Sequence, residues 1–101
     1  MSLNNSSEFD DVMNDGYVSG SVNVTTTEVE AKVGASRLAN REAITITNRG
    51  NTTIYYGPTG VTSTTGDALY KDQTVALPLG GLGIFLITAS GSSTAIVQEF
   101  S

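Results

Sequence analysis

The chain contains no cysteine and no histidine. It therefore can form no disulfide, no thiolate nucleophile, none of the usual zinc sites and no histidine-based catalytic triad. The side chains that could still take part in catalysis are isolated carboxylates, hydroxyls and amines. We therefore expect that the protein is not an enzyme and that it uses no cofactor and no metal.

Long hydrophobic runs are also missing. No apolar stretch approaches the roughly 20 residues that a membrane span requires. The residues after Met1 are polar, with neither the basic start nor the apolar centre of a signal peptide. We expect a soluble protein made in a cytoplasm, without a membrane partner.

Basic residues are few, five against ten acidic ones, and the net charge is −5. Residues 1–20 hold four acids and no base, which gives −4, whereas residues 21–101 hold six acids and five bases, which gives −1. An acidic N-terminal arm thus precedes a nearly neutral body. Neither part offers the basic stripe that binds nucleic acid, so we expect no such partner.

The body, residues 21–101, is predicted to be a single antiparallel β-sandwich or a jelly-roll-like barrel. About seven short runs rich in β-branched residues follow one another, with turn signals at intervals of roughly 8 to 12 residues. A chain of 101 residues has room for one such domain. The predicted core consists of Val29, Val33, Ile44, Ile46, Ile54, Tyr56, Val61, Leu69, Val75, Leu77, Ile84, Leu86 and either Ile96 or Val97.

The central feature of the sequence is a predicted hairpin over residues 43–56. Two β-like runs flank Asn48-Arg49-Gly50-Asn51, and Gly50 can take the positive φ of a tight turn. A type I turn is expected at 57–60, with its proline in second position. A second hairpin is predicted around residues 90–93.

The acidic arm, residues 1–20, has one ordered pattern. Phe9, Val12, Met13 and Tyr17 follow the spacing i, i+3, i+4, i+8 of one helical face. Two interpretations stay open. The arm is either a short helix whose apolar face docks on a partner, because two turns alone are unstable in water, or a loose leader with scattered apolar residues.

The run Ile84-Phe85-Leu86-Ile87 is apolar on both faces of a strand, whereas one face of a sandwich strand normally meets water. Phe85 and Ile87 are therefore either covered by a long loop or part of an interface. Together with the apolar residues of the arm they form the predicted interface set, which is Phe9, Val12, Met13, Tyr17, Phe85 and Ile87.

The segment that starts at Arg41 has the form Arg-x-x-Ile-x-Ile-x-Asn-x-Gly-x-x-x-Ile-Tyr-x-Gly and is followed by Gly60-Val61-Thr62. It resembles a segment of small β-sandwich virion proteins of tailed bacteriophages. The resemblance extends over about residues 29–100 and leaves the arm unmatched. It implies a structural protein of the virion without catalytic residues.

Two functions follow as hypotheses. The first is a capsid decoration or cement protein, a homo-oligomer made in the host bacterial cytoplasm, which stabilises the head by binding the major capsid protein or other virion proteins. The alternative is a tail-tip, fibre or head-to-tail connector module. In that role Tyr55, Tyr56, Tyr70 and the loop 61–67 would recognise host glycans.

Overall fold

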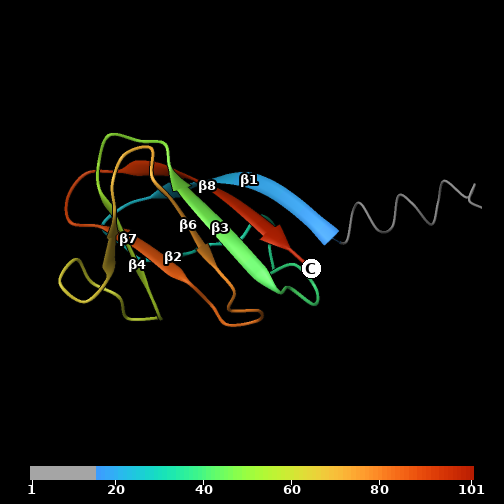
Figure 1. Cartoon of the computed structure of the whole chain (residues 1–101). Helices are drawn as coiled ribbons and strands as arrows, with labels where there is room; N and C mark the ends of the chain where they lie inside the picture. Colours follow the sequence, from blue (N-terminus) through green and yellow to red (C-terminus); the bar gives the residue numbers. More distant parts are fainter. Residues whose placement is uncertain (1–15) are drawn as a thin grey trace, which may run out of the picture.

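The computed structural model describes residues 16–101 of the chain. Within these residues the backbone forms strands joined by loops (Figure 1). The strands are β1 (Tyr17–Val24), β2 (Val29–Glu30), β3 (Ala43–Asn48), β4 (Ile54–Gly57), β5 (Asp67–Leu69), β6 (Thr74–Leu77), β7 (Phe85–Thr88) and β8 (Ser93–Phe100).

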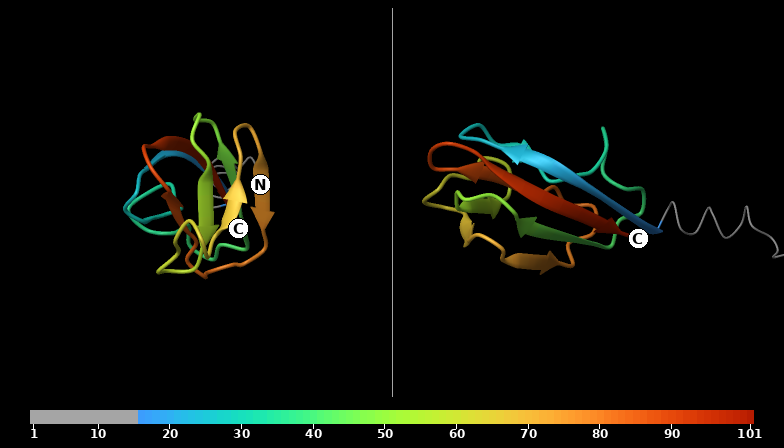
Figure 2. Two further views of the ribbon diagram at one scale, coloured as in Figure 1. Left: turned by 90° about the vertical axis from the view of Figure 1, so that its left-hand side faces the viewer. Right: turned by 90° about the horizontal axis from the view of Figure 1, so that it is seen from above.

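The strands form two four-stranded sheets, in the orders β1-β8-β3-β6 and β2-β7-β4-β5. β1 pairs with β8, β2 with β7, β3 with β6 and β4 with β5, all antiparallel, so the first half of the chain runs back along the second half. The pairs β3·β8 and β4·β7 join these ribbons into the two sheets. This is the eight-stranded jelly-roll arrangement, and the two layers are visible in Figure 2. The predicted all-β sandwich is confirmed.

The core lies between the sheets because alternate residues of each strand face inward. β3 and β8 show this period of two over their whole lengths. Most of the predicted core residues are buried or packed against the core. The structure adds Val24, Ala31 and Ala95, and it selects Val97 over Ile96 as the buried residue.

The predicted hairpin over residues 43–56 is wrong. Its two strands exist as β3 and β4, but β3 belongs to one sheet and β4 to the other. The second predicted hairpin fails in the same way, because β7 and β8 also lie in different sheets. In a jelly roll, most connections cross between the layers. Within the described chain, β4 and β5 are consecutive strands that do pair directly.

Asn48 explains why the chain turns into the other sheet here. Its side chain is fully buried. Nδ2 donates to the carbonyl oxygens of Thr52 (2.8 Å) and Leu69 (2.9 Å), and Oδ1 accepts from Gly50 N (3.0 Å) and Ser93 Oγ (2.7 Å). A single side chain thus replaces the ladder bonds that a hairpin would have made.

Gly50 is needed for a different reason from the predicted one. It is not among the residues with positive φ. A Cβ at this position would overlap Ser93 Oγ and would lie 2.8 Å from Thr94 N. The turn therefore requires glycine because the start of β8 packs directly on its backbone.

The turn after β4 is displaced by one residue from the predicted type I turn. Val61 N donates to Pro58 O (3.0 Å), and Gly60 has φ +89°, which suits the third position of a type II turn. The carboxylate of Glu28 accepts bonds from Gly60 N (2.7 Å) and Thr59 Oγ1 (2.9 Å). This ties the turn to the β1–β2 connection.

β1 begins at Tyr17, so the predicted boundary between arm and body, after Gly20, falls inside this strand. Tyr17 is not on a helical face. Its ring stacks on Phe100, with centroids 5.2 Å apart, and its hydroxyl accepts a bond from Gln98 Nε2 (2.9 Å). The other arm residues of the predicted interface, Phe9, Val12 and Met13, lie outside the described residues.

Candidate functional site

A pocket of about 640 Å³ opens between the two sheets at one end of the sandwich. Its size is within the range of small-molecule and side-chain binding sites, roughly 300 to 1,000 Å³. The lining is mainly apolar and comes from the ends of β4 and β6, the start of β7 and the loops beside them. The lining residues include Tyr56, Pro58, Leu77, Leu79, Leu82, Ile84 and Phe85, with Arg37 and Asp67 as the charged members.

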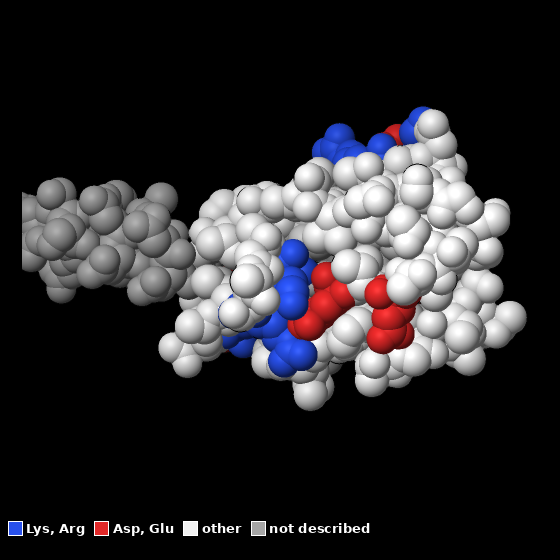
Figure 3. All heavy atoms as spheres, turned by 180° about the vertical axis from the view of Figure 1, so that it is seen from behind, with Lys and Arg blue, Asp and Glu red and all other residues white. Residues whose placement is uncertain are grey.

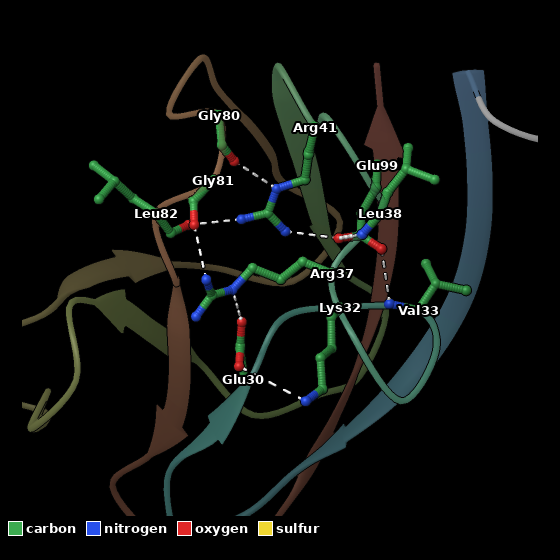
Figure 4. A network of polar contacts seen from close by, with 10 residues as sticks. All are labelled: Glu30, Lys32, Val33, Arg37, Leu38, Arg41, Gly80, Gly81, Leu82 and Glu99. Carbon is green, nitrogen blue, oxygen red and sulfur yellow. Dashed lines mark hydrogen bonds and ion pairs between the residues drawn. The ribbon is translucent and has the colours of Figure 1, made fainter.

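The connection between β6 and β7 forms one wall of the pocket, and two arginines hold its backbone (Figure 4). Arg41 donates from Nε to Gly80 O (2.8 Å) and from Nη2 to Leu82 O (2.6 Å). Arg37 donates from Nη1 to Gly81 O (2.8 Å). Three consecutive carbonyls are thus bound by charged donors, which make stronger hydrogen bonds than neutral groups do. These bonds restrain the backbone of a loop that is rich in glycine.

Arg41 is buried and is neutralised by Glu99, which is also buried. Nη1 of Arg41 lies 2.7 Å from Glu99 Oε2. Glu99 also accepts bonds from Val33 N (3.1 Å) and Leu38 N (3.2 Å). Both charges therefore have polar partners on several sides, the condition under which a buried ion pair is tolerated.

Arg37 is more exposed and pairs through Nε with Glu30 Oε2. Lys32 Nζ lies 3.7 Å from the other oxygen of the same carboxylate. In the view from behind, acidic and basic groups lie next to one another on a mostly uncharged surface (Figure 3). Because exposed ion pairs contribute little to stability, the main effect of this group is to orient Arg37 toward the loop.

The loop that the arginines hold presents two leucines to solvent. Leu79 is 38% exposed and Leu82 is 65% exposed. The loop passes close to its neighbours at Gly83, where a Cβ would lie 2.8 Å from Arg37 Nη2 and 3.0 Å from Phe85 Cε1. A fixed backbone with exposed leucines beside an apolar pocket is suited to docking another molecule, since little conformational freedom remains to be lost on binding.

Tyr56 and Asp67 face each other across the β4–β5 pair and add the polar part of the lining. Burial, and to a lesser degree the negative charge of Asp67, raises the pKa of Tyr56 above its ordinary value of 10.0. The hydroxyl therefore stays protonated at neutral pH. It can donate a hydrogen bond to a bound group.

These residues can bind another molecule mainly through apolar contacts. A few polar groups lie at the edge of the pocket. Within residues 16–101 no group of three or more histidine, cysteine, aspartate or glutamate side chains is placed to hold a metal ion. No helix in the same part of the chain has the length and apolar character to span a membrane.

The structure separates the two predicted interface residues of β7. Both are half-buried and alternate with the inward-facing Leu86 and Thr88. Both therefore point to the outer face of the sheet, but Phe85, at the start of β7, reaches the lining of the pocket, whereas Ile87 lies farther along the strand, opposite Tyr55. Phe85 thus belongs to the candidate site, and Ile87 does not.

The three tyrosines considered for glycan recognition do not all lie on one surface. Tyr55 and Tyr56 are consecutive in β4, so they point to opposite faces of the sheet. Tyr70 follows β5 and is 57% exposed. Within the described residues, Tyr56 is the one that lines the pocket.

The residues that shape the site, Arg37, Arg41, Leu79, Leu82 and Glu99, were not among the predicted site residues. A signal for Glu99 does exist. It follows Ala95 and Val97 at the next inward position of β8, where an apolar residue is expected. The sequence does not show which cation meets this acid, because Arg41 lies 58 residues away.

Comparisons of the chain with protein-family models, with curated proteins and with solved structures find no match.

Proposed function

We propose that this chain is a non-enzymatic structural protein of a tailed-phage virion, a capsid decoration or cement protein. It binds the major capsid protein through the pocket and the leucines beside it. The sequence resemblance described above supports the virion role. The geometry of the pocket end supports docking to a protein.

The observation that carries the proposal is the pair Leu79 and Leu82. Large apolar side chains on a glycine-rich loop would normally fold inward or move freely. Here the loop backbone is held by Arg37 and Arg41 while the leucines stay exposed beside an apolar pocket. Exposed apolar groups on a rigid support are typical of binding hot spots between proteins.

The mechanism is mass action. A protein that binds the assembled shell, and not its separated subunits, lowers the free energy of the shell in proportion to the logarithm of its own concentration. No chemical step is required. The jelly roll acts as a rigid carrier, and affinity depends on how well the pocket and its leucines fit the capsid surface.

Co-sedimentation with assembled capsids that lack their decoration protein tests the proposal. The variant Leu79→Ser/Leu82→Ser is expected to fold normally, since both side chains are exposed, and to lose at least about tenfold in affinity. Tyr70→Ser is the matched control because it removes another large exposed side chain, away from the pocket, and it should bind like the wild type. Equal binding of all three proteins would reject the proposed site.

The predicted role of the arm is tested in the same assay. A chain that begins at Gly16 keeps the whole of β1 and lacks Phe9, Val12 and Met13. Weaker binding by this chain would place the arm in the interface. Unchanged binding would remove the arm from the account and leave the pocket end as the docking surface.

A further inference from the structure

The two sheets have four edge strands, and these differ in length. β2, β5 and β6 contain two, three and four residues, whereas β1 contains eight. Proteins usually protect a long edge with charged residues, proline or a bulge, because its free backbone groups invite another strand. β1 contains neither a charged residue nor proline, and within residues 16–101 its backbone pairs with β8 alone. Figure 2, right, shows β1 in blue at the outside of its sheet.

The central part of β1 has a sequence that is symmetric about Gly20. The five residues Val18-Ser19-Gly20-Ser21-Val22 are the same in both directions. Two identical strands that pair antiparallel about a two-fold axis at Gly20 therefore place valine opposite valine and serine opposite serine. The axis lies near the middle of the strand, so Tyr17 to Asn23 of one copy align with Asn23 to Tyr17 of the other.

This register also keeps inward-facing residues beside inward-facing residues and exposed residues beside exposed residues. Val18, Gly20 and Val22 face inward, and Ser19 and Ser21 face solvent. A shift by one residue would place valines beside serines. The symmetric register instead continues the apolar face and the polar face of one copy into those of the next.

No repulsion between like charges opposes the pairing of two β1 strands. Within the four strands of this sheet the sole charged residue is Glu99, which is buried and paired with Arg41. Like charges directly opposite each other would destabilise a strand pair, and here none meet. Gly20 at the axis presents no side chain, and its inward side is already filled by Val33, whose Cγ1 would lie 3.0 Å from a Cβ there.

We propose that two copies of this chain associate through β1, antiparallel about a two-fold axis at Gly20, and so join their sheets into one of eight strands. The interface is isologous, the commonest form in homodimers. It is on a different part of the molecule from the pocket. It does not depend on the virion role proposed above.

Light scattering of the full-length protein, with matched charge variants, provides the first test. The wild type is expected to be a dimer. Ser19→Lys/Ser21→Lys should be a folded monomer, because each new lysine lies opposite another and both serines are exposed. Ser90→Lys/Ser92→Lys adds the same charges at exposed positions of the β7–β8 loop, outside the paired residues of β1, and should remain a dimer.

Charge complementation makes the test specific to the register. Ser19→Glu/Ser21→Glu should also be monomeric by itself. An equimolar mixture of the lysine and glutamate variants should dimerise again, because residue 19 of one copy lies opposite residue 21 of the other.

Cysteine cross-linking is clean in this chain, since it has no native cysteine. Paired antiparallel residues have Cα atoms about 4.5 to 5.5 Å apart, within the range that a disulfide spans. Oxidised Ser19→Cys/Ser21→Cys should give a covalent dimer, and Ser19→Cys/Asn23→Cys, which has no aligned cysteine pair, should not. A wild type that is monomeric at every concentration, a lysine variant that remains dimeric, or equal cross-linking of both cysteine variants would overturn the proposal.

Discussion

Arg41 and Glu99 form an ion pair inside the sandwich, with 0% and 1% of their side chains exposed and 2.7 Å between Nη1 and Oε2. Each charge also binds a different stretch of backbone. Glu99 accepts bonds from Val33 N and Leu38 N, and Arg41 donates to two carbonyls of the β6–β7 loop. The pair therefore connects the stability of the core to the shape of the pocket.

Glu99→Gln should lower the free energy of unfolding by about 3 kcal/mol or more, because it leaves the buried charge of Arg41 without its partner. Glu42→Gln makes the same change at an exposed position and should stay within about 0.5 kcal/mol of the wild type. Urea denaturation measures both values. A loss below about 1 kcal/mol for Glu99→Gln would show that the pair contributes little.

Asn48→Asp is expected to destabilise the protein by about 3 kcal/mol, because a carboxylate would replace the amide that donates to Thr52 O and Leu69 O. The variant keeps the size of the side chain, so the effect would report hydrogen bonding and charge. Asn51→Asp, at an exposed position in the same turn, serves as the control and should be nearly neutral. Thermal and urea unfolding at neutral pH compare the two variants, and equal stabilities would contradict the role of Asn48.

Two substitutions at Gly50 distinguish close packing from turn conformation. Alanine should cost about 1 to 3 kcal/mol because its Cβ meets the start of β8. Asparagine, which tolerates positive φ, would be accepted in the predicted hairpin but should be at least as harmful as alanine here. Gly81→Ala is the control, since nothing lies within 4 Å of a Cβ there. The denaturation midpoints of the three variants distinguish the two explanations. A Gly50→Asn variant with a midpoint close to that of the wild type would contradict the packing argument.

The raised pKa of Tyr56 predicts a pH dependence above neutrality. The folded state keeps this proton at a pH where the unfolded chain has begun to lose it. The resulting stabilisation is complete below pH 10.0, the ordinary pKa, and is lost as the pH rises through the higher pKa of the folded state. Stability curves of the wild type and Tyr56→Phe should differ in slope above this pH.

Asp67→Asn gives a second measurement of the same effect. It removes the smaller cause of the shift and leaves the burial of Tyr56, so the alkaline slope should change less than in Tyr56→Phe. Identical alkaline slopes for the wild type and Tyr56→Phe would show that the hydroxyl is not in the environment described.

Local pattern was enough to predict the fold class and most of the core, because alternation of apolar and polar residues depends on strand geometry alone. Ile44, Ile46 and Leu86 could be placed inside from their neighbours in sequence. Turn residues likewise marked where strands end. They did not show whether the next strand pairs with the last one or crosses to the opposite sheet.

That choice, and with it the site, was decided by tertiary structure. The same Asn-x-Gly sequence suits a hairpin or a crossing, and here Ser93 and the carbonyl of Leu69, distant in sequence, complete the bonds of Asn48 that favour the crossing. The pocket depends on Arg41 meeting Glu99 across 58 residues. The sequence by itself thus determined an all-β chain with a thin apolar core. Long-range partners determined the order of its strands and the surface on which its leucines are displayed.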